Sequence, residues 1–337
     1  MKHFLMVIIF IWFVFFFCAL FFCLNHSVLE DEINSAISYY HLMKLLKKSR
    51  SSEITLLVVG DIMLNRGVEY VIEEKGNGDF RFPFLKIANN LNKADILFGN
   101  LEGPISHRGT KSGSIYSFRM DPRAVEGLKY AGFDILSLAN NHMFDYGSVA
   151  LIDTMNILKK NNIEYVGAGM NKKEAYSLKI IKIKNTKVGF LAYTNLGPNN
   201  WSAKENMPGI AWIDEDYFPQ IVQQIRDAKK QTDILIVSLH SGVEYVSFPD
   251  DFQRKFAKLC IENGADIVIG HHPHVIQPVI KYKNGWIAYS LGNFVFDQSF
   301  LQDTMRGLVL EIKIRNGKIK EIKKREVKIS KYFQPYF

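Results

Sequence analysis

GHHPH, residues 270–274, directly follows the apolar run ADIVI at residues 265–269. A short apolar run of this kind predicts a buried strand, and open α/β sheets bind their ligands beyond the carboxyl ends of their strands. Three of the nine histidines of the chain lie within these five residues. Neutral imidazole is a common ligand of zinc, manganese and iron. A polar loop that happens to be rich in histidine is the alternative, but the concentration favours a metal or phosphate site at this strand end.

Short apolar runs alternate with helical patterns from residue 53 onward, which predicts an α/β sandwich with mixed sheets. Asp121 and Pro122 predict an N-cap and first position for one of the helices. Hairpins are expected around Asn185-Thr186, Asn284-Gly285 and Asn316-Gly317. Expected strands are 54–59, 95–98, 134–138, 164–166, 179–183, 187–193, 233–239 and 265–269, and expected helices are 65–74, 84–92, 122–131, 148–161, 217–230 and 251–263.

Polar side chains follow five of these expected strands at the point where each strand ends. They are Asp61, Glu102, Asn141-His142, His240 and the histidines of 271–274. Carboxylates supply charge and can bridge two cations, a carboxamide oxygen is a neutral ligand, and imidazoles complete the coordination. Two metal ions about 3.5–4 Å apart clamp an anionic centre and generate a hydroxide nucleophile at neutral pH. The pattern predicts a site for one or two divalent ions.

The first residues of the chain indicate a membrane protein. Residues 4–24 form an uncharged apolar run that is long enough, as a helix, to cross a hydrocarbon core of about 30 Å. A cleavable signal peptide is the competing interpretation, but no small-x-small cleavage site follows the run. Phe22 also disfavours lipid attachment at Cys23. We therefore expect an uncleaved transmembrane signal anchor at residues 1–24.

The charges around this run predict its orientation. Lys2 precedes it and the acidic residues 30–32 follow it, so the expected arrangement is a cytoplasmic N-terminus and an extracellular C-terminal domain. Residues 25–52 are expected to form a stalk or linker, either lying on anionic headgroups or solvated. Cys260 is the only cysteine beyond the apolar run, so no disulfide is expected within the domain at 53–337.

The formal net charge of +8 fits acidic partners, such as a membrane surface, an anionic polymer or a phosphorylated substrate. No basic stripe interleaved with aromatic residues is present in the sequence, so nucleic acid is not an expected partner.

Six segments run in one order through the motif core, residues 54–300. They are 60–64 (GDIML), 99–105 (GNLEGPI), 138–147 (LANNHMFDYG), 238–245 (SLHSGVEY), 270–275 (GHHPHV) and 289–294 (YSLGNF). This series resembles the calcineurin-like metallophosphoesterase superfamily, and within it the CapA-like capsule synthesis proteins of poly-γ-glutamate biosynthesis. The resemblance implies a metallophosphoesterase-like αββα sandwich for residues 53–337.

The resemblance also implies residue roles around a centre of manganese, iron or zinc. His142 would be a general acid or anion binder, and Asp145 would orient its imidazole. The implied metal ligands are Asp61 and His274 for the first ion, Glu102 as the bridge, and Asn141, His240 and His272 for the second ion.

Two positions depart from the phosphoesterase pattern. Met63 stands where that pattern has a histidine, and Glu102 stands where the wider superfamily has aspartate. The first ion then lacks an imidazole unless His271 or water replaces it. Such changes are typical of the capsule branch and favour it over an ordinary phosphatase.

Several residues keep two interpretations. Glu244 and Asn293 either line the site or belong to a surface loop and a turn, respectively. Arg119 either meets an anionic substrate or is solvated. The loop at 107–111 is either a lid or an unstructured connection.

Three functions follow from these expectations. The first is a membrane-anchored protein of anionic polymer synthesis or export, with other membrane subunits of a polymer synthase as possible partners. The second is a metal-dependent phosphoesterase, a hydrolase acting on an extracellular substrate. The third is a non-catalytic module that binds polymer or a partner.

Overall fold

The computed structural model describes residues 35, 38–39, 53–112 and 115–337. The expected anchor at residues 1–24 and nearly all of the expected linker lie outside these residues. Within them, no helix is both long and apolar enough to cross a membrane. Residues Glu53–Phe337 form one compact unit, and the fold described below is that of this unit.

The first sheet has eight strands and is mixed. Its parallel part positions the polar strand ends, and an antiparallel extension closes its other side. The parallel strands are β1 (Ile54–Ile62), β2 (Ile96–Leu101), β3 (Ile135–Ser137), β4 (Glu164–Val166) and β13 (Asn293–Val295), and the antiparallel ones are β14 (Arg306–Arg315), β15 (Lys318–Ile329) and β16 (Pro335–Tyr336).

The second sheet has six strands, and its central strands are parallel. Its members, in spatial order, are β11 (Val279–Tyr282), β12 (Gly285–Ala288), β10 (Ile267–His271), β9 (Ile234–His240), β7 (Thr186–Thr194) and β6 (Lys179–Ile183). A separate pair, β5 (Ala168–Gly169) and β8 (Gly209–Ile210), is antiparallel.

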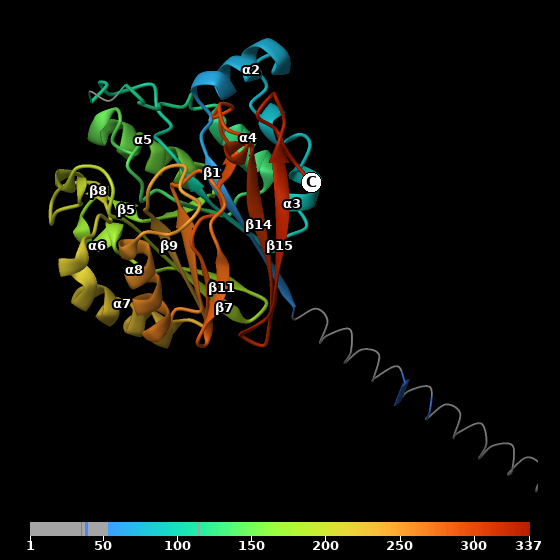
Figure 1. Ribbon diagram of the computed structural model, residues 1–337, viewed down its shortest axis with the longest axis vertical. Helices are drawn as coiled ribbons and strands as arrows, with labels where there is room; N and C mark the ends of the chain where they lie inside the picture. Colours follow the sequence, from blue (N-terminus) through green and yellow to red (C-terminus); the bar gives the residue numbers. More distant parts are fainter. Residues whose placement is uncertain (1–34, 36–37, 40–52, 113–114) are drawn as a thin grey trace, which may run out of the picture. The chain divides into compact units, whose positions relative to one another are not determined.

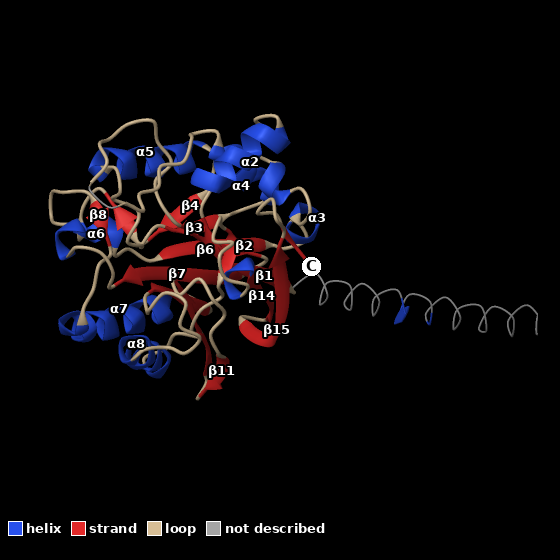
Figure 2. Cartoon of the chain, turned by 45° about the horizontal axis from the view of Figure 1, so that its top comes forward, coloured by secondary structure: helices blue, strands red, loops and turns tan. Residues whose placement is uncertain are grey.

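The two sheets pack face to face between two layers of helices. Alternate residues of β1 face opposite ways: Ile54, Leu56 and Val58 pack against the second sheet, whereas Leu57 and Val59 face helices. Helices α2 (Arg66–Gly76), α4 (Ala124–Ala131) and α5 (Gly147–Lys160) cover the outer face of the first sheet, and α7 (Phe218–Gln231) and α8 (Asp251–Glu262) cover that of the second (Figures 1 and 2). The expected α/β class with mixed sheets is confirmed, in the layer order helix, sheet, sheet, helix.

Two expected helices differ from the sequence prediction. Asp121 is not an N-cap, because α4 begins at Ala124 and the Asp121 carboxylate instead accepts a hydrogen bond of 2.7 Å from the backbone N–H of Arg123. The helix expected at 84–92 is only the single turn α3 (Ala88–Leu91), which is rich in asparagine, a poor helix former. Other short turns are α6 (Lys172–Ala175) and the 3₁₀ segments Phe82–Phe84, Asn199–Trp201, Glu215–Tyr217 and Asp303–Met305.

The hairpin turns are close to their expected places. Asn316-Gly317 forms the expected turn, with φ of 54° and 65°. The other two turns lie one residue earlier than expected. The β6–β7 turn is Lys184-Asn185, with φ of 45° and 65°. The β11–β12 turn is Lys283-Asn284, because Tyr282 pairs with Gly285.

Candidate metal centre

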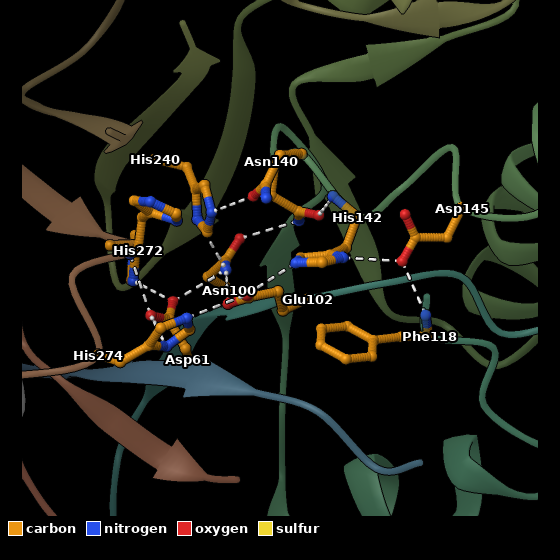
Figure 3. A network of polar contacts seen from close by, with 12 residues as sticks. Asp61, Asn100, Glu102, Phe118, Asn140, His142, Asp145, His240, His272 and His274 are labelled. Atoms are coloured by element: carbon orange, nitrogen blue, oxygen red, sulfur yellow. Dashed lines mark hydrogen bonds and ion pairs between the residues drawn. The ribbon is translucent and has the colours of Figure 1, made fainter. Parts of the chain in front are cut away.

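The polar ends of strands from both sheets meet at one place (Figure 3). In the first sheet Asp61 of β1 pairs with Asn100 of β2, and in the second His240 of β9 pairs with His271 of β10. Parallel strands share the edge at which their carboxyl ends lie, so the packing of two sheets brings two such edges together. We call the resulting group the strand-end cluster; it consists of Asp61, Glu102, Asn141, His240, His271, His272 and His274.

Asp61 is fully buried and is surrounded by nitrogen atoms. Its Oδ1 accepts a hydrogen bond of 2.9 Å from the Asn100 side chain, and its Oδ2 accepts one of 3.0 Å from the backbone N–H of His272. The Nδ1 atom of His271 lies 3.2 Å from Oδ1. Burial by itself would raise the pKa of Asp61, but His271 and the other nearby imidazoles outweigh it and hold the pKa below its ordinary value.

Glu102 follows β2 and is also fully buried. Its Oε1 lies 3.6 Å from Nε2 of His274 and 3.9 Å from Nε2 of His142, and no described residue gives this oxygen a hydrogen bond. Burial, and after it the charge of Asp61, raises the pKa of Glu102 well above its ordinary value. A nearby divalent cation would favour the ionised carboxylate, so this buried oxygen fits a metal ligand.

Three imidazoles of the cluster, those of His240, His272 and His274, are held in the form that binds metal. Burial lowers the pKa of His240 well below its ordinary value, and the neighbouring imidazole of His272 acts in the same direction. Burial and the imidazole of His274 lower the pKa of His272 to about 3. Burial also lowers the pKa of His274. Neutral imidazoles bind divalent metal ions without first losing a proton.

Some ring nitrogens of the cluster have no hydrogen-bond partner among the residues that the structure describes. They are Nε2 of His271 and Nδ1 of His272, whereas Nδ1 of His271 has the contact of 3.2 Å with Asp61. His272 and His274 also have positive φ, 97° and 58°, a strained conformation for non-glycine residues. Unpaired buried nitrogens and local strain are both typical of a binding site rather than of a packed core.

The donor atoms form two groups that could each hold an ion. Atoms of Asp61, Glu102 and His240 all lie within 4.8 Å of one another, and so do atoms of Glu244, His272 and His274. Carboxylates, imidazoles and a carboxamide suit manganese, iron or zinc. The second group brings in Glu244, whose role the sequence left open. The assignment of His272 and His274 to different ions stays a prediction.

His142 stands beside the cluster with an acidic partner. Its Nδ1 lies 2.7 Å from Oδ2 of Asp145, and that oxygen also accepts a hydrogen bond of 2.7 Å from the backbone N–H of Phe118. The Phe118 ring lies against the imidazole at a centroid distance of 4.1 Å (Figure 3). A carboxylate at Nδ1 places a proton there and turns Nε2 toward Glu102. The geometry suits an imidazole that exchanges a proton through Nε2.

Comparison with known proteins identifies the family. Residues 55–298 match the family described as "Bacterial capsule synthesis protein PGA_cap". This chain belongs to the PGA_cap family of bacterial capsule synthesis proteins. It is 36% identical to the PGA biosynthesis protein CapA of Bacillus subtilis (strain 168), over 77% of this chain and 67% of that protein. It is 34% identical to the capsule biosynthesis protein CapA of Bacillus anthracis, over 78% of this chain and 65% of that protein.

The match thus spans about two thirds of the length of these PGA_cap relatives. Among solved structures, a phosphatase from Mycoplasma pneumoniae aligns with a TM-score of 0.51 and 11% identity, over 82% of this chain and 94% of that one. At such low identity the likeness concerns the fold alone. It shows that this PGA_cap chain shares a mixed α/β fold with that phosphatase.

Two asparagines of the PGA_cap site were not predicted as site residues. Asn100 donates to Asp61, and its Nδ2 also lies 3.2 Å from Nδ1 of His240. Asn140 donates to the Asn100 side chain at 3.2 Å and to the backbone carbonyl of Leu101 at 2.8 Å. A polar residue inside an apolar strand run is the signal that could have indicated Asn100, because buried polar groups need partners.

The structure bears on three positions that the sequence left open. Asn293 lines the site, since its Oδ1 lies 2.9 Å from Nδ1 of His274. Arg119 does not line the cleft beside the cluster; it lies over the Tyr146 ring at 4.2 Å and donates to backbone carbonyls of the 107–109 loop. Met63 is buried in the core under the helices, and its sulfur accepts a hydrogen bond from the Asn65 N–H. Met63 supplies no imidazole at this position, and the imidazole that lies nearest to Asp61 is that of His271, 3.2 Å away.

Proposed function

We propose that this protein is a membrane-anchored, extracytoplasmic component of the synthesis or export of poly-γ-glutamate or a related anionic surface polymer, and that the strand-end cluster holds one or two divalent metal ions. The convergence of buried carboxylates and neutral imidazoles from two sheets carries the proposal. Membership in the PGA_cap family supports the polymer assignment, and the names of the Bacillus relatives point the same way.

The anchoring part of the proposal rests on the sequence. The apolar run at residues 4–24 is long enough to span a bilayer, and the charges around it favour a cytoplasmic N-terminus. Residues 25–52 would then connect the anchor to the domain at 53–337. Anchoring would place the domain beside other membrane subunits of a polymer synthase.

The expected ligands are Asp61, Glu102, Asn141, His240, His272 and His274, as the resemblance implies. Nε2 of His240 and Oδ1 of Asn141 already face each other at 2.8 Å. A bound manganese, iron or zinc ion would act as a Lewis acid on an anionic or carbonyl centre and make a water molecule more acidic. His142, oriented by Asp145, would deliver or hold a proton at Nε2 beside that centre.

A deletion and complementation experiment tests this function. Removing the gene from its host should reduce surface polymer, and the wild-type protein should restore it. His240→Ala should fail to restore polymer, because it removes a buried imidazole of the cluster. His107→Ala is the matched control, since His107 is an exposed loop histidine. Unchanged polymer in the deletion strain would contradict the assignment. Full restoration by His240→Ala would instead favour the non-catalytic binding module.

A second candidate, a metal-dependent phosphoesterase, is favoured by the His142–Asp145 contact of 2.7 Å. The full-length protein in detergent, supplied with Mn²⁺, should then hydrolyse phosphate monoesters or diesters. His142→Ala should lower the rate by about 100-fold or more, and His107→Ala should leave it unchanged. A metal-loaded protein without turnover on a broad ester panel would exclude this candidate.

A further inference from the structure

A cleft of about 420 Å³ opens beside the strand-end cluster. Its lining includes His142 and His274, so a molecule in the cleft would contact the proposed reaction site directly. Tyr245 and Phe300 supply aromatic walls, and their rings meet edge to face at 5.3 Å. Among the described residues that line it, Arg66 is the only one with a permanent positive charge.

The guanidinium of Arg66 is held in a fixed orientation. Its Nε and Nη2 donate to the two carboxylate oxygens of Asp297, at 3.0 and 2.7 Å. Asp297 is itself fixed, because its side chain is only 8% exposed and accepts a hydrogen bond of 2.9 Å from the backbone N–H of Gly67. Two parallel bonds between planar groups fix both position and rotation. Arg66 is therefore preorganised before any ligand arrives.

A second contact connects Arg66 to the proposed chemistry. Its Cζ lies 5.1 Å from the centroid of the Phe118 ring, and the same ring packs on the imidazole of His142 at 4.1 Å. The Arg66 guanidinium and the His142 imidazole thus pack against the same Phe118 ring. No hydrogen bond joins Nη1 of Arg66 to the residues that the structure describes, and the side chain is 35% exposed.

We propose that Arg66 binds an oxyanion of the substrate, a carboxylate or phosphate group, while the neighbouring bond of that substrate lies at the strand-end cluster. This inference rests on the proposed function, because it names the substrate group that the same site recognises. Arginine suits the task, since the donors left free by Asp297 remain in a rigid plane that matches a planar or tetrahedral oxyanion. Asp297 is a positioning residue in this assignment.

Binding of two probes tests the inference. The full-length protein in detergent is titrated with γ-linked triglutamate and, separately, with inorganic phosphate, by calorimetry. Each titration is run with Mn²⁺ and with EDTA. Arg66→Gln should weaken binding of at least one probe by about tenfold or more, because hydrogen bonds to charged groups contribute strongly. A loss confined to triglutamate identifies a carboxylate ligand, and a loss confined to phosphate identifies a phosphate ligand.

Arg81→Gln is the matched control. Arg81 makes the same kind of bidentate pair, from Nε to Oδ1 and from Nη2 to Oδ2 of Asp79, and lies over the ring of Tyr130, but it does not line the cleft. It should leave the affinity unchanged. The inference is overturned if the wild type binds neither probe, if Arg66→Gln binds as tightly as the wild type, or if Arg81→Gln loses as much affinity.

A second measurement needs no variant and covers the case in which Arg66→Gln fails to fold. Phenylglyoxal modifies exposed arginines of the wild-type protein, and peptide masses report each site. A bound probe should protect Arg66 and leave Arg81 reactive; equal reactivity of Arg66 with and without probe overturns the inference. Protection of Arg66 in EDTA together with normal polymer from His240→Ala would refute the metal-dependent function while the oxyanion site stands.

Discussion

Individual residues of the strand-end cluster are placed as metal ligands would be, and this placement lowers the stability of the fold. Oε1 of Glu102 and Nε2 of His271 lie buried without a hydrogen-bond partner among the described residues. Each such atom destabilises the fold by about 1–3 kcal/mol. His272 adds backbone strain through its φ of 97°. Violations of ordinary folding rules that gather at one point indicate that function, not stability, selected these side chains.

Asp145→Asn tests the orientation of His142. Asparagine keeps the size of the side chain and can still accept the hydrogen bond from the Phe118 N–H, but it removes the charge beside Nδ1. We expect polymer yield in the complemented deletion strain, at limiting expression, to fall by about 10- to 100-fold. The melting temperature should change little. Asp153→Asn is the control, because Asp153 lies on α5, away from the cluster, and pairs with Arg108. An equal loss of polymer yield in Asp153→Asn would contradict a special role of Asp145.

The residue types of the site could be predicted from the sequence, because metal binding requires carboxylate, imidazole and carboxamide side chains. All six expected ligands and His142 lie in or beside one polar network. Glu244 and Arg66 could not be assigned from sequence, since a lone charged residue in a loop or at the first position of a helix is usually solvated. Only the folded chain shows that Glu244 lies by His272 and His274, and that Asp297, 231 positions further along the chain, fixes Arg66.

At the scale of elements, the positions of the strands along the chain were more predictable than their ends or their partners. Apolar runs indicated β1, β2, β9 and β10, but the strands continue past the expected ends, so Asp61 and His240 lie inside them. Strand β13 was not predicted as a strand. Its pairing with β1 sets Asn293 beside Asp61, and this long-range contact has no local signal in the sequence.

Gly270→Ala tests how tightly the elements under the cluster pack. A Cβ at Gly270 would lie 1.8 Å from the Tyr289 carbonyl oxygen, so the backbone of β10 or its neighbour must shift. We expect the free energy of unfolding to fall by about 3 kcal/mol or more. Gly147→Ala is the comparison, since its φ is 77° but nothing lies within 4 Å of the added Cβ; it should cost about 1 kcal/mol. Urea unfolding measures both, and equal costs would contradict the close approach.

At the scale of the whole molecule, the residue pattern predicted the mixed α/β class, the family resemblance implied the layer order, and the contacts between the two sheets could not be predicted. Consecutive apolar residues in β1 point to opposite faces of the sheet, so both faces need a packing partner, and the structure supplies helices on one and the second sheet on the other. The choice of facing residues depends on packing, such as the stacking of Phe98 on Phe190 at 5.4 Å. That packing also determines which strand ends face each other, so the site geometry depends on the complete core.

Because both sheets contribute expected ligands, metal binding at the proposed site should stabilise the whole domain. The folded state presents Asp61 and Glu102 from one sheet and His240 from the other, whereas the unfolded chain presents them far apart. An ion at 100 times its Kd would add about 2.7 kcal/mol to the free energy of unfolding, and melting temperature should rise by several degrees. Scanning calorimetry of the wild type with Mn²⁺ and with EDTA measures the difference. His240→Ala should lose this increase and His107→Ala should keep it; an equal increase in all three proteins would show that the ion binds elsewhere.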